Sequence, residues 1–570
     1  MNIGSIAKLS RYWHTVRYLK PVQIYGRLWF RLRRPAADLR PAPSLWPAVG
    51  GWIPCARQPS MTIEPTVGRA SVGQPPGGLK PALHSAPIGF RFLSVERKVS
   101  SASDWNRGDW PKLWLYNLHY FDDLNADDAA IHVERHRALV SRWIAENTPA
   151  AGNGWEPYPL SLRLVNWIKW LAAGNAPEAG MVDSLAVQAR WLTKRLEWHL
   201  LGNHLLANAK ALVFAGTFFT GPEADAWRAQ GLSILRREHA EQILDDGGHF
   251  ERSPMYHSII LEDLLDLIQL AQRWPGGADA VLVDGWRQLA TRMLRWLTTM
   301  THLDGEIAFF NDAASGIAPN PGALMDYAKA LGVATPTFAL GPLTMLKASG
   351  FLRVQQGKAN LIADVGEIGP DYLPGHAHAD TLSFELSVFG QRLVVNSGTS
   401  EYGLGAERLR QRGTAAHSTV QIDGADSSEV WSGFRVARRA RPVGLSVSET
   451  ADVVEVVCAH DGYRRLCGRP LHRRAWRITA QGLRVTDTIE GGCGAAVARY
   501  HFHPAVAVSG DNRGGVLRLP DGHTIRWAVS GGSARIVPST WHPEFGQSIA
   551  NTGIELVFAG AQAMLEFSWD

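Results

Sequence analysis

The spacing of apolar residues divides most of the chain into two stretches with different periods. From about residue 110 to 340, apolar residues recur at intervals of three and four, as in HVERHRALVSRWIAEN and SIILEDLLDLIQLAQRW. This spacing is typical of amphipathic helices, and short breaks with Gly or Pro, such as TGPEAD and WPGGAD, separate the segments. Because successive helical hairpins of this kind can close into a ring, we predict an α/α toroid here.

After about residue 345 the period changes to two. Segments such as TLSFELSVFGQRLVVNSG and HRRAWRITAQGLRVTDTIEG alternate apolar and polar residues, with Gly, Asp or Asn at the turns. This pattern predicts antiparallel strands that pack as a β-sandwich. The sequence therefore predicts a multi-domain α-then-β fold, with an α/α toroid over residues 106–343 and an antiparallel β-sandwich over residues 344–570. A groove between the two domains would be a natural ligand site.

Residues 1–105 precede both domains. The first 35 residues alternate Arg and Lys with Trp, Tyr and Leu, which indicates a basic amphipathic helix. They contain no continuous apolar segment followed by a small-residue cleavage site, so we do not expect a signal peptide. The helix either packs on the body of the protein or binds a membrane surface or targeting factor. Residues from about 36 to 100 are rich in Pro, Gly and Ser and predict an irregular connection.

Charge and composition narrow the class of partner. The net charge is +5 and the pI about 9.0, which suits a polyanion, either nucleic acid or an acidic polysaccharide. The sequence has no zinc-finger spacing, RNP-type aromatic run or dense Lys tract, so we do not expect nucleic acid. No window approaches the roughly 18 uninterrupted apolar residues of a membrane span. The four cysteines form no CxxC pair and no disulfide framework.

Three segments of the helical half gather polar and aromatic residues that could carry chemistry. They are WEPYPLSLR at 155–163, LGNHLLAN at 201–208 and DGGHFERSPMYH at 246–257. Each alone could be a helix cap or a buried hydrogen-bond network. Because all three lie in one domain and are rich in Asn, His, Tyr and Arg, we predict that they share a pocket.

A histidine pair stands out at the start of the β half. The segment PGHAHAD places His376 and His378 two residues apart, just before a strong strand, and His417 begins a later strand. His378 and His417 could meet on adjacent strands and bind a metal ion, which would require a third ligand, ideally a carboxylate. The candidate on the intervening strand is Asn396, which brings no charge. Both alternatives, a bound divalent metal and none, stay open.

Four of these motifs together make the chain resemble the heparinase II/III family of polysaccharide lyases, which are related to alginate lyases. They are GNHLLAN, DGGHFERSPMYH, GHAHADTLSFELSVFGQRLVVNSGTSEY and RGTAAHSTV, and the resemblance covers about residues 110 to 440. It is strongest to a bacterial branch associated with exopolysaccharide or capsule loci. The family fold is an α/α toroid followed by an antiparallel β-sandwich, as the periodicity predicts independently.

The resemblance implies cleavage of a uronic-acid-containing polysaccharide by β-elimination. The uronate carboxylate must be neutralised, a base must remove the C5 proton, and an acid must protonate the departing 4-oxygen. Carried over to this sequence, Asn203 neutralises the carboxylate with help from His204, and Tyr256 is the acid and also a candidate base. His376 is the base or a second neutralising group, and Tyr402 is a further candidate acid.

The resemblance also implies substrate-binding and metal positions. Cationic and polar neighbours would hold the acidic glycan and assist ionisation of tyrosine. We expect substrate contacts from Glu156, Tyr158, Arg163, Glu251, Arg252, His257, Arg408 and Arg412. In metal-containing members the second His of the HxH pair, an Asp and a later His bind a structural zinc. Those positions are His378, Asn396 and His417, and the Asp-to-Asn change puts the metal in doubt but not the reaction.

Two other functions stay open as alternatives. A glycoside hydrolase on a similar toroid would use two carboxylates. The candidates are Glu156, Asp246, Glu251, Asp304, Glu306 and Asp312. A non-catalytic glycan-binding protein of exopolysaccharide assembly would keep the fold without needing an acid and a base. The family favours the cell envelope or periplasm, a cytoplasmic location is not excluded, and the sequence does not indicate an oligomeric state.

Overall fold

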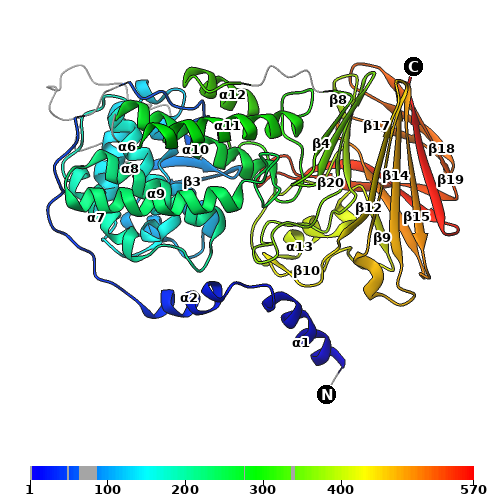
Figure 1. The fold of residues 1–570 in the computed structure, drawn as a ribbon, viewed down its shortest axis with the longest axis horizontal. Coiled ribbons are helices and arrows are strands. Elements are labelled where there is room, and N and C mark those ends of the chain that lie inside the picture. The colour runs from blue at the N-terminus through cyan, green and yellow to red at the C-terminus, as the bar shows by residue number, and fades with distance from the viewer. Residues whose placement is uncertain (1–2, 48–50, 63–86, 275–276, 336–340) are drawn as a thin grey trace.

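The protein consists of a helical half and a β-sheet half that lie side by side (Figure 1). The computed structural model describes residues 3–47, 51–62, 87–274, 277–335 and 341–570. The last helix of the helical half ends at Ala330, and the first strand of the β half begins at Leu343. The predicted order, helices and then antiparallel strands, is confirmed.

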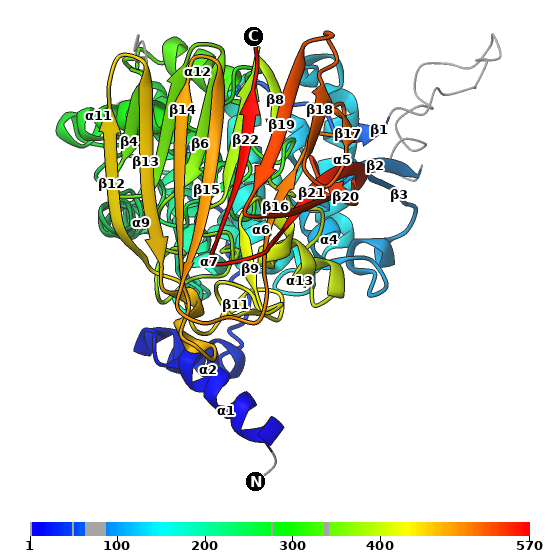
Figure 2. The same cartoon turned by 90° about the vertical axis from the view of Figure 1, so that its right-hand side faces the viewer.

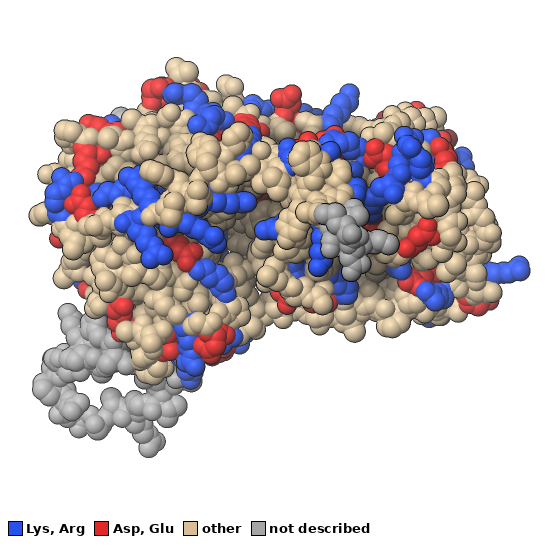
Figure 3. Space-filling view, turned by 90° about the horizontal axis from the view of Figure 1, so that it is seen from below, with Lys and Arg blue, Asp and Glu red and all other residues tan. Residues whose placement is uncertain are grey.

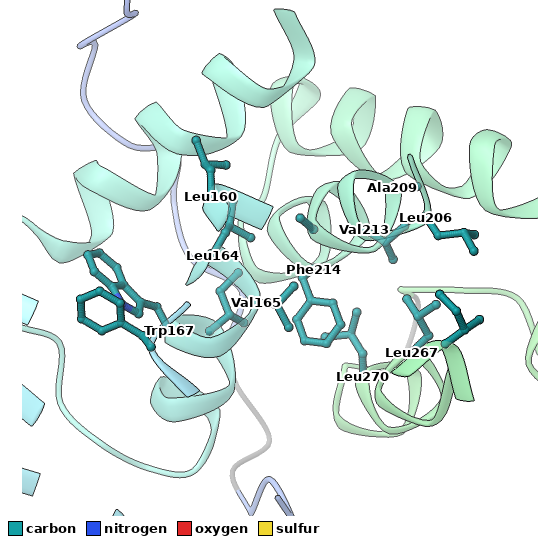
Figure 4. Close-up of a cluster of buried hydrophobic side chains, with 14 of the residues drawn as sticks. Leu160, Leu164, Val165, Trp167, Leu206, Ala209, Val213, Phe214, Leu267 and Leu270 are labelled. Atoms are coloured by element: carbon teal, nitrogen blue, oxygen red, sulfur yellow. The ribbon is translucent and has the colours of Figure 1, made fainter. Parts of the chain in front are cut away.

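The helical half is built around α8, which is apolar on all sides and buried along almost its whole length. Figure 4 shows Leu206, Val213 and Phe214 of α8 beside Leu164 of α6 and Leu270 of α10. The helices are α4 (Lys112–Leu118), α5 (Val133–Glu146), α6 (Pro157–Ala172), α7 (Met181–Lys194), α8 (Gly202–Phe218), α9 (Pro222–Gln242), α10 (Pro254–Arg273), α11 (Ala280–Thr299) and α12 (Pro321–Ala330). Burial of this shared core fixes the position from which α8 and α10 begin.

The β half contains three larger antiparallel sheets around one apolar core. A five-stranded sheet has the order β4-β5-β6-β7-β8, and a four-stranded sheet has the order β20-β21-β16-β9. An eight-stranded sheet, β12-β13-β14-β15-β22-β19-β18-β17, forms the outer face seen in Figure 2. The alternation of buried and exposed residues along β14 and β15 agrees with the period of two in the sequence.

The strands of the five-stranded sheet are β4 (Leu343–Leu346), β5 (Phe351–Gln356), β6 (Ala359–Asp364), β7 (Phe384–Val388) and β8 (Gln391–Val394). The four-stranded sheet contains β9 (Val420–Ile422), β16 (Ala496–His501), β20 (Gly532–Trp541) and β21 (Ile549–Phe558). The eight-stranded sheet contains β12 (Pro442–Glu449), β13 (Val453–His460), β14 (Leu471–Thr479), β15 (Gly482–Glu490), β17 (Ala507–Gly510), β18 (Gly514–Arg518), β19 (Thr524–Ser530) and β22 (Gln562–Ser568). A short pair, β10 (Val430–Trp431) and β11 (Arg435–Val436), and the helix α13 (Ala406–Arg412) lie between β8 and β12.

The two halves are joined by a small apolar core and by polar contacts. Trp296 of α11 packs against Phe351 and donates a hydrogen bond from Nε1 to Ser349 Oγ at 2.8 Å. Arg353 of β5 donates to the carbonyl oxygens at the end of α11, including that of Thr301 at 2.7 Å. Loops from the two halves are therefore held in fixed positions where the domains meet.

The described part of residues 1–105 contains more helices and strands than the sequence predicted. Two helices, α1 (Ile3–Val16) and α2 (Pro21–Leu32), lie along the lower side in Figure 1 and contact the body. The predicted irregular connection contains strands β1 (Met61–Thr62), β2 (Ile88–Phe92) and β3 (Val95–Val99), which pair as one sheet. That part of the prediction was wrong, because such short strands give no clear period between Pro and Gly residues. Residues 63–86 of the connection lie outside the described residues.

All four cysteines, Cys55, Cys458, Cys467 and Cys493, are free thiols. Within the described ranges, no helix is both long and apolar enough to cross a bilayer.

Candidate active site

The predicted catalytic residues come from separate segments of both halves and meet where the halves join. The Tyr256 hydroxyl lies 2.9 Å from that of Tyr402, and the Tyr256 ring lies 4.0 Å from the His376 ring, centroid to centroid. His376 Nε2 lies 3.9 Å from Glu251 Oε2. Tyr256 lies in the first turn of α10, and His376 lies in the loop before β7. The structure therefore brings two candidate acids and one candidate base into contact.

Asn203 and His204 open α8 beside this cluster. Leu201 and Gly202 adopt positive φ angles of 63° and 56°, which turn the chain sharply into the helix. A Cβ on Gly202 would lie 2.5 Å from Leu373 Cδ2 and 2.9 Å from Glu251 Oε1, so only glycine allows this close approach. The N-terminus of α8 thus lies against Glu251 of the cluster, and a helix N-terminus favours a bound carboxylate.

His204 is held in a charged environment. Its ring packs on Tyr158 at 4.5 Å between centroids, and its Nδ1 lies 3.1 Å from Glu197 Oε1. Burial opposes protonation of His204, but the charge and hydrogen bond of Glu197 outweigh it and raise the pKa. About a third of the side chain, 31%, stays exposed. His204 therefore stays protonated to a higher pH than an isolated histidine, and its side chain is partly exposed next to Asn203 in the first turn of α8.

Tyr256 and Tyr402 are protonated hydroxyls at neutral pH. Burial raises the pKa of Tyr256 well above its ordinary value, and the neighbouring Tyr402 adds to this effect. Burial likewise raises the pKa of Tyr402, with Asp312 contributing, although the Arg408 guanidinium 4.9 Å from its ring opposes the shift. Both hydroxyls can therefore donate a proton. Neither tyrosine is suited to act as the base, because it would first have to ionise and burial disfavours the tyrosinate anion.

Asp312 organises the centre of this cluster. It accepts hydrogen bonds from His376 Nδ1 at 2.9 Å, His378 Nε2 at 2.8 Å and Arg408 Nη2 at 2.7 Å. Burial alone would raise its pKa, but Arg408 and the two imidazoles outweigh burial and hold the pKa well below its usual range. Because Asp312 accepts from Nδ1, His376 carries a proton there, and its Nε2 is directed to the other side of the ring.

Asp312 also connects the loop to the helical half. The Asp312 backbone N–H donates to the His376 carbonyl at 2.9 Å. The Asp312 backbone carbonyl accepts a hydrogen bond from Ser253 Oγ at 2.5 Å. Ser253 caps α10 by accepting from the Tyr256 N–H at 3.2 Å. One residue thus fixes both His376 and the helix turn that carries Tyr256. From the sequence, Asp312 was predicted only as a hydrolase carboxylate, although an acid at the end of the apolar run AFFND is a signal of a buried charge.

Several predicted substrate contacts lie inside the protein instead. Arg163 is fully buried against the Trp143 ring and donates to Gln188 at 3.1 Å, so it belongs to the core of the toroid. His257 is fully buried, with its Nε2 3.0 Å from the Met293 carbonyl, and burial lowers its pKa to about 3. These two side chains have no surface with which to touch a polymer.

Arg408 and Arg412 are also fully buried, but they contact residues that hold the site in place. Arg408 pairs with Asp312, and Arg412 donates to the Ala377 carbonyl at 2.8 Å, which holds the loop of His376. Arg252 donates to the Glu367 carbonyl, and burial lowers its pKa. We therefore assign Arg408 and Arg412 to positioning of the loops, whereas Arg252 stays partly exposed and remains a candidate substrate contact.

Glu156 and Glu251 differ in their surroundings. Glu156 accepts hydrogen bonds from Lys112 and Tyr116 at the edge of the toroid. Glu251 is buried beside His376, and its Oε2 has no hydrogen-bond partner among the described residues. Burial raises the pKa of Glu251, partly offset by His376 and His204. This oxygen lies 3.9 Å from His376 Nε2, where it can assist the imidazole.

The arrangement of carboxylates does not suit a hydrolase. Of the six candidates, Asp246 accepts from Ser349 at 2.7 Å, and Asp304 pairs with Arg392 at 2.7 Å, both outside the cluster. Only Glu251 and Asp312 contact His376, and Asp312 is enclosed by its three donors. A hydrolase needs two carboxyl groups that both reach the sugar, and this cluster offers one.

The proposed metal ligands form a hydrogen-bonded chain and do not converge on one point. His378 Nδ1 lies 3.3 Å from His417 Nε2, while Asn396 Oδ1 lies 3.3 Å from the opposite ring nitrogen, His417 Nδ1. His378 uses its other nitrogen to donate to Asp312. Burial lowers the pKa of His378 to about 4 and that of His417 well below its usual value, so both rings are neutral.

His378 Nε2–H donates to Asp312, and the Asn396 amide oxygen can accept a hydrogen bond only from His417 Nδ1–H. Asn396 and His378 therefore contact opposite ring nitrogens of His417, so one metal ion could not touch all three side chains. Among the described residues, no group of three His, Cys, Asp or Glu is placed to hold a metal. The residues at these three positions therefore do not fit the structural zinc of the family.

We expect the purified protein to hold less than one zinc per chain by elemental analysis. Addition of zinc or of a chelator should leave the melting temperature unchanged, since His378 and His417 already bond to each other and to polar partners. His417→Ala should lower the melting temperature equally with and without chelator. One zinc per chain, with a melting temperature that falls on chelation, would contradict this reading of the three residues.

Comparison with known proteins agrees with the geometry. A heparin-sulfate lyase of Bacteroides stercoris is 25% identical over 268 residues, which cover 44% of this chain and 40% of the relative. FtsZ-localized protein C of Caulobacter vibrioides is 27% identical over 378 residues, 62% of this chain and 59% of that protein. The chain therefore spans only about half the length of these relatives. The crystal structure of heparinase III superposes with a TM-score of 0.65 and 18% identity, covering 79% of this chain and 76% of that one, which establishes the fold alone.

Family models match both halves of the chain. The model "Heparinase II/III N-terminus" matches residues 178–324, and the model "Heparinase II/III-like, C-terminal" matches residues 339–570. The two matches together cover more than half of the sequence and contain all five predicted catalytic residues. The chain belongs to the heparinase II/III-like family.

Proposed function

We propose that this protein is a polysaccharide lyase that cleaves an acidic, uronate-containing polysaccharide by β-elimination. One observation carries the proposal: the helix N-terminus that bears Asn203 and His204 lies against Glu251, which lies beside His376 of the contacting pair Tyr256 and His376. A binding groove alone requires neither a proton donor nor a proton acceptor. The names of the heparin-sulfate lyase relatives support the same reaction class.

The first task of the site is to make the C5 proton of the uronate acidic. Asn203 donates its amide hydrogens to the substrate carboxylate, and protonated His204 neutralises its charge. The free N–H groups at the start of α8 add a favourable dipole. Because this end of α8 is largely buried, these interactions act in a medium of low dielectric constant and are correspondingly strong.

The second task is to move two protons. His376 Nε2 takes the proton from C5, the C4–O bond breaks as the C4–C5 double bond forms, and Tyr256 donates its hydroxyl proton to the leaving oxygen. Asp312 stabilises the imidazolium that forms on His376, as a carboxylate does behind a catalytic imidazole. Tyr402 lies within hydrogen-bond distance of Tyr256 and can return a proton to it. Since the two rings are in contact, with centroids 4.0 Å apart and planes tilted by 32°, we propose that acid and base act from the same side of the sugar.

The substrate class and the location follow from the family and from the charge of the site. A cationic His204 suits a uronate, and bacterial exopolysaccharides or glycosaminoglycan-like polymers carry such groups. We propose that the protein acts on such a polymer in the cell envelope or periplasm. A non-catalytic glycan-binding protein that keeps the fold is the alternative that an activity assay separates from the lyase.

The lyase proposal predicts two coupled signals from the wild-type protein on a panel of uronate polysaccharides. Ultraviolet absorbance of an unsaturated uronate should rise together with new reducing ends. Tyr256→Phe removes the proton donor and should lower kcat by about 10²- to 10⁴-fold. Reducing ends without absorbance would mean hydrolysis, and no signal on any polymer, including the producer's own, would favour the non-catalytic candidate.

Tyr463→Phe is the matched control for that variant. Tyr463 is equally enclosed and donates to the Val420 carbonyl at 2.7 Å, but it lies in the β core away from the cluster. Its replacement should lower the melting temperature and leave kcat unchanged. Equal losses of activity in both variants would show that Tyr256 acts only through stability.

The pH dependence should report on His204. Glu197 raises the pKa of His204, so the cation persists to higher pH than in an isolated histidine. Glu197→Gln lowers that pKa, and the alkaline limb of the kcat/KM profile should move to lower pH. Measured profiles between about pH 5 and 9 test this shift around the ordinary histidine pKa.

Glu241→Gln is the control for the pH profile. Glu241 pairs with Lys20 and Tyr372 and makes no contact with His204. Its profile should coincide with that of the wild type. An unchanged alkaline limb in Glu197→Gln would contradict a role for protonated His204.

A further inference from the structure

The two N-terminal helices carry a surface that the proposed reaction does not use. Residues 1–37 contain eight Lys and Arg residues and no Asp or Glu. Residues 38–570 hold the other 50 of the 58 basic residues and all 53 acidic ones, so the rest of the chain has a net charge of −3. The basic character of this protein therefore comes entirely from α1, α2 and their flanks.

Both helices expose apolar residues at helical spacing. On α1 these are Leu9, Tyr12, Trp13 and Val16, and on α2 they are Tyr25, Leu28, Trp29 and Leu32. Each set follows the spacing i, i+3, i+4, i+7, which places its members on one face of the helix. Trp13 is 65% exposed and Trp29 61%, values far from those of core residues. We call these eight residues with Lys8, Arg11, Arg17, Arg27, Arg31, Arg33 and Arg34 the N-terminal basic surface.

The opposite sides of the helices are docked to the body, so the exposure is not a result of fraying. In α1, Thr15 accepts a hydrogen bond from Trp431 Nε1 at 3.1 Å, and Ser10 accepts one from Arg438 at 2.7 Å. In α2, the Phe30 ring lies 4.1 Å from the His199 ring. Both helices lie on the lower side of the molecule in Figures 1 and 2, with no other element beneath them.

The basic and aromatic character continues onto the toroid next to α2. A groove of about 510 Å³ separates α2 from residues 193–199 and is lined by Trp29, Phe30, Lys194, Arg195 and Trp198, among others. Figure 3 views this lower face and shows Lys and Arg side chains gathered over its left half. The surface thus combines exposed Trp and Tyr, apolar stripes and positive charge over both helices and their neighbours.

We infer that the N-terminal basic surface binds a membrane containing anionic lipids, with α1 and α2 lying in the plane of the headgroups. Trp and Tyr suit the boundary between headgroups and acyl chains, and Leu and Val enter the apolar edge of the bilayer. Arg and Lys beside them pair with lipid phosphates. A protein partner that buried these apolar stripes would usually present acidic groups to the seven cations of this surface. An anionic bilayer supplies both negative charge and an apolar edge.

Vesicle sedimentation with the full-length protein tests this inference independently of any lyase activity. The protein should sediment with phosphatidylcholine vesicles that contain phosphatidylglycerol and much less with phosphatidylcholine alone, and high salt should weaken binding. Arg11, Arg27 and Arg31 changed together to Gln should reduce the affinity about a hundredfold. Trp13→Ser with Trp29→Ser should reduce it about tenfold or more.

Matched variants elsewhere keep the test specific. Arg513, Arg518 and Arg526, exposed on the β half, changed together to Gln remove the same charge and should leave vesicle binding unchanged. Ile131→Ser with Val281→Ser is the control for loss of exposed apolar side chains, because these residues are 79% and 83% exposed. Equal sedimentation with both vesicle types, or binding unaffected by the α1 and α2 variants, would overturn the inference. So would dimerisation through this surface without vesicle binding.

Discussion

The architecture of the candidate site depends on one buried carboxylate. Asp312 has no exposed surface and is surrounded by Arg408, His376 and His378, so its charge is balanced within hydrogen-bond distance. A buried ion of this kind is costly unless every partner is present. The requirement for all three donors fixes the loop of residues 374–380 against α13 and against the start of α10. Positions that are far apart in the sequence are thereby held in the geometry that proton transfer needs.

The helical and β halves contribute different candidate catalytic residues, and each half holds its residues in place in a different way. The helical half supplies Asn203 and His204 at one helix N-terminus and Tyr256 at another, both anchored in the core of the toroid. The β half supplies His376 and Tyr402 from loops that the Asp312 network and Arg412 hold in place. A substrate at the junction can thus contact helix ends anchored in the core and loops that buried hydrogen bonds hold in place.

The fold could be predicted from the sequence because burial imposes a period on each element. The change from a period of 3.6 to a period of 2 near residue 345 corresponds to the change from α12 to β4. The short strands β1, β2 and β3 escaped prediction because they have too few residues to show a period among Pro and Gly.

The site was predicted less completely than the fold. The resemblance pointed to residues that do meet in space, but it could not separate exposed from buried cations. Only the tertiary structure shows that Arg163 packs on Trp143 and that His257 contacts the Met293 carbonyl. Asp312 was not recognised as the organiser, since its partners lie 64 to 96 residues away in the sequence. The sequence could not show that Asn396 and His378 contact opposite ring nitrogens of His417, because that arrangement depends on how the strands and loops pack.

The mass of the products formed from a uronate oligosaccharide of defined length tests the elimination mechanism most directly. Elimination adds nothing to the substrate, so the masses of the two products should sum to the mass of the oligosaccharide, and one product should carry an unsaturated uronate. Products whose masses sum to the substrate plus one water would show hydrolysis and would contradict the roles assigned here to Asn203, Tyr256 and His376.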